Sequence, residues 1–167
     1  TDEVRLLAVS KTQPSQKIQE LHQLGHNDFG ENYADELLEK ATILSDLPIN
    51  WSFIGRLQSN KIRKIVSVAA EIQTVETEKH IRLIAKAAKD YDKTPYPIYI
   101  AVNLAKEPQK AGVQTPSEIF ALATNITSNY KDLSLQGIMA IPPLQLLSGD
   151  MKPEQLDHYQ ELYAVSQ

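Results

Sequence analysis

One lysine stands where this sequence could most readily do chemistry. Lys11 directly follows the apolar run Leu6–Val9, and in folds that alternate strands and helices the reactive groups lie where strands end and loops begin. At such a strand end we expect the ammonium group to lose solvation, which would lower its pKa and free an amine to condense with a carbonyl. The alternative is a surface lysine whose charge extends into solvent.

A short basic cluster is the second feature with chemical potential. Arg56, Lys61, Arg63 and Lys64 lie within nine residues. A helix beginning next to Ser59–Asn60 could bind an anion such as phosphate at its N-terminus. We favour a simpler interpretation, in which these charges form the solvated face of a helix. The cluster is short and contains no aromatic side chains, so nucleic-acid binding is not expected.

Two other patterns have ordinary structural explanations. His22 and His26 have the i, i+4 spacing of a metal pair, but Gly25 should end the helix between them, so we predict no metal site. Glu31 could act as an acid or a base at a strand end, although a carboxylate there more often pairs with a nearby cation. The sequence has no glycine-rich phosphate loop.

The elements that must position Lys11 alternate along the chain. Apolar residues with helical spacing fill residues 34–41, 62–69, 81–88 and 119–126. Six short runs typical of strands lie between and around these helical segments. They are Leu6–Val9, Asp28–Glu31, Trp51–Ile54, Ile72–Val75, Ile98–Val102 and Gly137–Ile141. The first and fifth runs are nearly continuous in apolar residues, as in strands buried on both faces. The alternation predicts a parallel sheet with right-handed crossovers.

The spacing and boundaries of these elements limit the possible folds. The predicted strands begin about every 26 residues, which is the period of a βα unit. A closed eight-unit barrel would need roughly 205 residues or more, so we expect an open six-stranded sheet or most of a barrel. Thr115–Glu118 reads as a capping box with proline at the first helical position, and Gly25 as a left-handed C-terminal cap. The last stretch, Glu154–Gln167, reads as a helix without a following strand.

The composition excludes several classes of protein. The 167 residues include 17 basic and 21 acidic side chains, for a net charge of −4, which gives no general attraction to nucleic acid or to anionic membranes. The absence of cysteine excludes a disulfide scaffold, a thiol nucleophile and a cysteine zinc site. We find neither a membrane span nor a signal peptide. We therefore expect one soluble domain whose composition is compatible with a cytoplasmic location, and a monomer because the predicted helices carry no second apolar stripe.

Five blocks of sequence, in order along the chain, are similar to one known family. They are Ala8–Thr12, Phe29–Tyr33, Trp51–Lys61, Val102–Asn103 with Lys110–Val113, and Leu135–Pro142. With these blocks the chain resembles the pyridoxal phosphate homeostasis proteins over residues 6–143, and the part from Phe53 to Lys61 is highly specific. The resemblance implies an α/β fold, a TIM-like (β/α)8 barrel related to the N-terminal domain of bacterial alanine racemase.

The resemblance also implies a cofactor and its ligands. Lys11 matches the lysine that binds pyridoxal 5′-phosphate (PLP) through a Schiff base, and Asn32 and Met139 match strand-end positions near the cofactor. No catalytic residue and no metal ligand is carried over. The implied function is a largely non-catalytic protein of intracellular PLP homeostasis, which buffers PLP or delivers it to PLP-dependent apo-enzymes and affects amino-acid and keto-acid balance.

Two alternatives to this function remain open. One is a weak PLP-dependent amino-acid racemase, or a related enzyme, that uses Lys11. PLP itself supplies the electron sink, but an enzyme must add a proton donor or acceptor on a chosen face. Alanine racemase takes one such group, a tyrosine, from a second domain that has no counterpart here. The other alternative is a Schiff-base aldolase that uses Lys11 without a cofactor.

The sequence departs from the family in two respects. Ser52 stands where the family usually has histidine. Family members also continue into a strand rich in serine, glycine and methionine and a final strand rich in glycine and threonine, which complete the barrel and hold the cofactor phosphate. These strands and the family's N-terminal helical segment are not found in this sequence. We therefore expect residues 1–167 to be a single PLP-binding domain within a longer chain, with about six βα units of an incomplete barrel.

Overall fold

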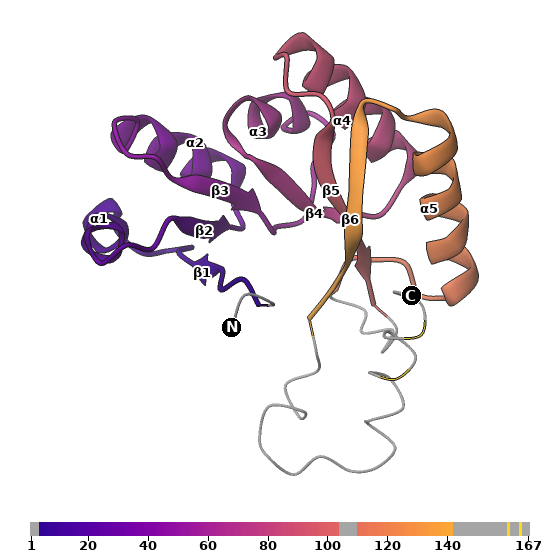
Figure 1. The fold of residues 1–167 in the computed structure, drawn as a ribbon, viewed down its shortest axis with the longest axis horizontal. Coiled ribbons are helices and arrows are strands. Elements are labelled where there is room, and N and C mark those ends of the chain that lie inside the picture. Colours follow the sequence, from indigo (N-terminus) through magenta and orange to yellow (C-terminus); the bar gives the residue numbers. More distant parts are fainter. Residues whose placement is uncertain (1–3, 104–109, 142–159, 161–163, 165–167) are drawn as a thin grey trace.

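The computed structural model describes residues 4–103 and 110–141, together with Gln160 and Ala164. Within these residues strands and helices alternate strictly (Figure 1). The elements are β1 (Ala8–Val9), α1 (Ser15–Gln23), β2 (Asp28–Glu31), α2 (Ala34–Ile43), β3 (Asn50–Phe53), α3 (Ile62–Val68), β4 (Glu71–Val75), α4 (Glu78–Asp90), β5 (Tyr96–Val102), α5 (Pro116–Asn129) and β6 (Leu133–Ala140).

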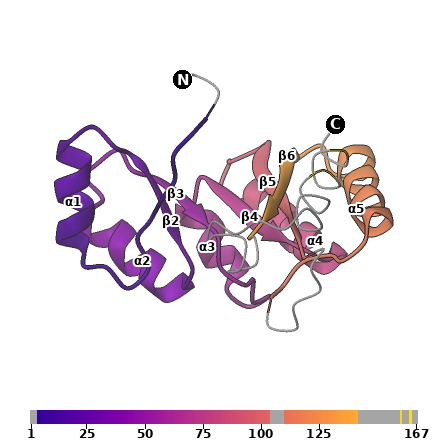
Figure 2. The ribbon, with the colours of Figure 1, turned by 90° about the horizontal axis from the view of Figure 1, so that it is seen from below.

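The strands form one parallel sheet in which their order is the order of the chain, from β1 to β6. This is the order in which strands follow one another in a (β/α)8 barrel. The helices lie along the outside of the curved sheet, from α1 at one end to α5 at the other (Figures 1 and 2). The predicted parallel sheet is therefore confirmed for the described residues.

The hydrophobic core lies between the sheet and this layer of helices. Each helix contributes the apolar stripe that its sequence predicts, and the strands contribute the side chains facing it. Fully buried members include Ile18, Leu37, Ile65, Ile84 and Ile119 from the helices and Phe29, Phe53, Ile72 and Ile98 from the strands.

Both predicted helix boundaries are confirmed. Gly25 has a φ of 93° just after α1, and its N–H donates to the carbonyl of His22 at 2.8 Å. Glycine adopts this left-handed conformation without the steric penalty of a Cβ atom. At the start of α5, Thr115 and Glu118 form the reciprocal capping box, with Pro116 in the first turn.

The first strand is shorter and more exposed than its sequence predicts. The run Leu6–Val9 suggested a strand buried on both faces, but β1 contains only Ala8 and Val9, and Val9 is 51% exposed. The prediction is wrong because β1 lies at the edge of the described sheet and pairs only with β2. By contrast β5, between β4 and β6, is mostly buried, as predicted.

The predicted terminal helix Glu154–Gln167 lies outside the described residues, apart from Gln160 and Ala164. Among the helices that the structure describes, none combines the length and apolar character needed to span a bilayer.

Candidate functional site at the carboxyl edge of the sheet

The carboxyl ends of parallel strands meet at one edge of the sheet, and this edge gathers most of the predicted site residues. Lys11 follows β1 by two residues, Asn32 follows β2 directly, and Met139 lies next to the end of β6. Two of them, Asn32 and Met139, line the same pocket of about 190 Å³. Its other lining residues are Ile54, Arg56, Thr74, Ala101, Val102, Lys110, Ala111 and Ile141.

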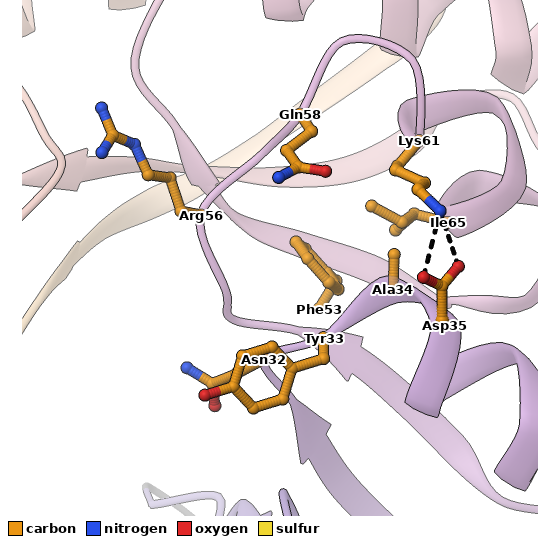
Figure 3. A pocket seen from close by; sticks show the side chains of 9 residues that line it. All are labelled: Asn32, Tyr33, Ala34, Asp35, Phe53, Arg56, Gln58, Lys61 and Ile65. Atoms are coloured by element: carbon orange, nitrogen blue, oxygen red, sulfur yellow. Dashed lines mark hydrogen bonds and ion pairs between the residues drawn. The ribbon is translucent and has the colours of Figure 1, made fainter.

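A second pocket of about 350 Å³ adjoins the first, because Asn32 and Arg56 line both. Figure 3 shows Phe53 and Ala34 at the floor of this pocket and Gln58 directed into it. Arg56 lies on one side of the pocket, and an ion pair lies on the other. That ion pair joins Lys61 Nζ to Asp35 Oδ1 at 2.7 Å.

Only part of the predicted basic cluster forms a solvated helix face: Arg63 and Lys64 are exposed on α3, whereas Arg56 precedes the helix and lines both pockets. Lys61 pairs with Asp35, and Arg63 pairs with Asp90 while stacking over the ring of Tyr91. The opposite side of α3 is buried through Ile62, Ile65 and Val66.

Asn32 is held at the pocket by a close approach of two loops. A Cβ atom on Gly55, in the segment after β3, would lie 1.8 Å from the carbonyl oxygen of Asn32. Only glycine lets these two backbones pack so closely. The side-chain Oδ1 of Asn32 is buried and has no hydrogen-bond partner within the described residues. The site therefore offers a buried acceptor with unused capacity for a donor.

Lys11 lies at the same edge but lines neither of these two pockets. Its side chain is exposed, in the turn that follows β1. The prediction that strand-end placement desolvates this ammonium group is therefore wrong for the described structure. The physical reason is the edge position of β1, which has no strand on its other side among the described residues.

A largely buried polar cluster, which we call the Lys40 cluster, contacts the backbone on either side of Lys11. It consists of Ser10, Glu31, Glu36 and Lys40. Lys40 Nζ donates to Glu31 Oε1 at 2.7 Å, to Glu36 Oε1 at 2.6 Å and to the carbonyl of Ser10 at 2.7 Å. Ser10 Oγ also donates to Glu31 Oε1, at 2.6 Å. The prediction that Glu31 pairs with a cation is confirmed.

Sequence reasoning did not identify Lys40 as that cation. The available signal was its place on α2, three residues after Leu37 and four before Leu44, both of which are buried. A lysine on the buried face of a helix needs a carboxylate partner, and Glu36 one turn earlier and Glu31 on the preceding strand supply two.

Ser52 belongs to a second polar cluster, at the start of β4. Its hydroxyl donates to Glu71 Oε1 at 2.7 Å, and the same oxygen accepts from Gln73 Nε2 at 2.7 Å and from Arg5. Burial by itself raises the pKa of Glu71, but the hydrogen bonds from Arg5, Ser52 and Gln73 outweigh it and leave the pKa below its ordinary value. The hydroxyl that replaces the family's imidazole thus stabilises a carboxylate.

The two histidines with helical spacing bond to different neighbours. His22 Nδ1 lies 2.6 Å from Asn27 Oδ1, and His26 Nε2 lies 2.7 Å from the carbonyl of Asp28, beyond Gly25. Within the described part of the chain no group of three or more potential metal ligands is found.

Two curated proteins similar to this chain carry the same name. The pyridoxal phosphate homeostasis protein of Schizosaccharomyces pombe is 41% identical over 140 residues, which cover 83% of this chain and 57% of that protein. The protein of the same name in Pseudomonas aeruginosa is 40% identical over 141 residues, which cover 83% of this chain and 59% of that protein. The chain thus spans a little under three fifths of the length of these relatives.

Solved structures with a similar fold include PipY of Synechococcus elongatus PCC7942. The structure without PLP has a TM-score of 0.87 and 30% identity, and the match covers 99% of this chain and 74% of that one. The structure of PipY with PLP bound has a TM-score of 0.83 and 29% identity, and the match covers 98% of this chain and 73% of that one. An alanine racemase of Clostridium difficile shares the fold at 11% identity, with a TM-score of 0.75 over 99% of this chain and 43% of that one.

These similarities confirm the predicted TIM-like α/β fold and the predicted resemblance. Residues 1–165 match the family described as alanine racemase, N-terminal domain. The chain therefore belongs to the family of the alanine racemase N-terminal domain.

Proposed function

We propose that this protein binds PLP at the carboxyl edge of its sheet, with Lys11 as the covalent anchor, and that it serves intracellular PLP homeostasis. The observation that carries the proposal is the shared pocket of Asn32 and Met139 on the edge where Lys11 also lies. Relatives at about 40% identity are named pyridoxal phosphate homeostasis proteins, and PipY, at 29%, has been solved with PLP bound.

The residues at this edge suit the chemistry of PLP. The buried Oδ1 of Asn32 has no partner among the described residues and can accept a hydrogen bond from the cofactor. Met139, Ile54 and Ala101 provide apolar walls for an aromatic ring. Arg56 and Lys110 add positive charge to the pocket lining, which favours a ligand that carries phosphate.

When bound, PLP supplies an aldehyde that condenses with amines and a ring that accepts electrons. In this proposal Lys11 Nζ holds the cofactor, the amide of Asn32 orients it and Met139 packs against it. The exposed position of Lys11 keeps the anchor accessible to solvent. This accessibility supports a role in holding and releasing PLP, with PLP-dependent apo-enzymes as recipients, rather than catalysis in a site closed to water.

The test is the absorption spectrum of the purified protein with PLP, before and after borohydride. We expect a visible band that borohydride removes while linking the cofactor to Lys11, and we expect Lys11→Ala to lack both. Lys17→Ala, which alters an exposed lysine on α1, is the matched control and should behave as the parent protein. A band that persists in Lys11→Ala would place the anchor on another lysine, and a folded protein without any band would refute PLP binding.

A second measurement separates storage of PLP from catalysis. Loaded protein is mixed with a PLP-dependent apo-enzyme, and in parallel with amino acids in deuterated water. We expect the apo-enzyme to gain activity and the amino acids to keep their α-protons. Exchange of the α-proton that depends on Lys11 would instead favour a weak racemase or a related enzyme.

We also propose that residues 1–167 belong to one domain that acts as a monomer in the cytoplasm. The continuous sheet from β1 to β6 supports the single domain. Light scattering at micromolar concentration tests the monomer, and a mass of twice the chain would overturn it.

A further inference from the structure

We propose that the Lys40 cluster positions Lys11, because it holds the peptide groups on both sides of that residue. Lys40, Glu31 and Glu36 are then positioning residues, which act through the backbone and do not touch the cofactor. The inference rests on the proposed function for the role of Lys11, and it adds the device that fixes the anchor in place.

The hydrogen bonds on the two sides of Lys11 converge on one ion pair. On the N-terminal side of Lys11, the carbonyl of Ser10 accepts a hydrogen bond from Lys40 Nζ at 2.7 Å. On the C-terminal side of Lys11, the N–H of Thr12 donates to Glu36 Oε1 at 2.7 Å, and Lys40 Nζ donates to the same oxygen at 2.6 Å. The two peptide groups that flank the Lys11 Cα atom are therefore tied to the same ammonium–carboxylate pair.

The backbone at this turn needs such a restraint. Thr12 has a φ of 62°, in the left-handed region that residues other than glycine rarely adopt. Residues held there persist when their surroundings over-determine the conformation. The hydrogen bond from the Thr12 N–H to Glu36 is a local contact that favours it.

Stability alone does not account for charges buried so deeply. Lys40 is 4% exposed and Glu31 is fully buried. Three hydrogen bonds use all three protons of the Lys40 ammonium. Burying an ion pair removes hydration that its attraction barely replaces, so an apolar residue on this face of α2 would often serve stability as well. The cluster differs from such a residue in fixing the backbone from Ser10 to Thr12.

The exposure of the Lys11 side chain makes the backbone restraint important. The Lys11 side chain is exposed and has little packing to orient it, so the placement of its Cα atom sets the region that the amine can reach. A displacement of about 1 Å in a reacting group can slow a reaction by as much as about a hundredfold. Loosening the turn should therefore slow the reaction of Lys11 with PLP without changing the lysine itself.

The first experiment needs no cofactor, because it measures amide hydrogen exchange at Thr12. We expect exchange to be about tenfold faster in Lys40→Met and in Glu36→Ala than in the parent protein. The matched control is Lys93→Met. Lys93 is also a lysine with three hydrogen bonds, but it donates them to backbone carbonyls at the end of α3, on the opposite edge of the sheet.

The second experiment measures how fast borohydride traps PLP on Lys11 in the same variants. We expect trapping to be about tenfold slower in Lys40→Met, unchanged in Lys93→Met, and largely restored in Lys40→Arg, which keeps the charge and the donors. Thermal unfolding establishes that each variant is folded. Because Lys40→Met leaves Glu31 buried without its cation, Glu36→Ala decides both measurements if Lys40→Met does not fold.

The outcomes distinguish this inference from the proposed function. Equal Thr12 exchange in the Lys40, Glu36 and Lys93 variants would overturn the positioning role, and so would unchanged trapping in a folded Lys40→Met. If the parent protein itself shows no PLP on Lys11, the proposed function fails. The exchange at Thr12 then decides by itself whether the cluster holds the turn.

Discussion

Glu71 is a residue whose ionisation links the fold to pH. Hydrogen bonds from Arg5, Ser52 and Gln73 hold its pKa below the ordinary value of 4.5 in spite of burial. A carboxylate with a lowered pKa in the folded state stabilises the protein above its unfolded pKa. This stabilisation is lost as the pH falls through the folded pKa.

We therefore predict a pH-dependent effect of Glu71→Gln. At pH 7 the variant should have a smaller free energy of unfolding than the parent protein, and the difference should shrink as the pH falls below about 4. Urea unfolding at a series of pH values measures it. Ser52→Ala, which removes one donor, should give a smaller difference with the same trend. A difference that stays constant from pH 7 to pH 3 would show that Glu71 does not titrate as the hydrogen bonds require.

At the scale of a helix, the capping box of α5 makes a separate prediction. Thr115 Oγ1 accepts from the N–H of Glu118, and the Glu118 carboxylate accepts from the N–H of Thr115. Thr115→Ala should lower the free energy of unfolding by about 1 kcal/mol, because the first turn loses a side-chain acceptor. Thr127→Ala is the control within the same helix, since its hydroxyl bonds back to the carbonyl of Ala123 and caps nothing. Equal losses for the two variants in urea unfolding would argue against the cap.

Elements with a strong local signal could be predicted from the sequence. The helices followed from apolar spacing, and two of their boundaries, the end of α1 at Gly25 and the start of α5 at the Thr115–Glu118 box, followed from signals that act within a few residues. The exposure of β1 could not be predicted, since hydropathy does not distinguish a strand at the edge of a sheet from one in its middle. Val9 is apolar in either place.

Strand-end position singled out Lys11, whereas the other candidate site residues were expected from the resemblance to a known family. Asn32 and Met139 were expected near a cofactor because they match family positions at strand ends, and in the structure they line one pocket. The partnership of Lys40 with Glu31 depends on how α2 packs against β2, which spacing along the chain does not fix. The need for Gly55 likewise depends on the distance between two loops.

At the scale of the whole molecule, the core should respond as one cooperative unit. Ile98 is fully buried on β5 and pairs with Ile72 on β4 and Leu135 on β6. Ile98→Ala should lower the free energy of unfolding by about 2–5 kcal/mol, because it removes buried methyl groups and leaves a cavity. Val9→Ala, on the exposed edge strand, should lower it by less than about 1 kcal/mol.

Urea unfolding followed by tryptophan fluorescence, through Trp51, measures both variants. The slope of free energy against urea should remain that of the parent protein, since the surface exposed on unfolding is nearly unchanged. Similar losses of unfolding free energy in the two variants would contradict the difference in burial. A second transition in the unfolding curve would contradict a single core.

The agreement between sheet order and chain order has a consequence for synthesis on the ribosome. Each described strand pairs only with the strands before and after it in sequence, and a single helix joins each pair. No pairing in this part of the chain waits for a distant segment, so the loop-closure entropy of each step is small. A strand and its helix can dock on the preceding unit soon after both leave the exit tunnel, and the growing polypeptide can gain structure from its N-terminus onward.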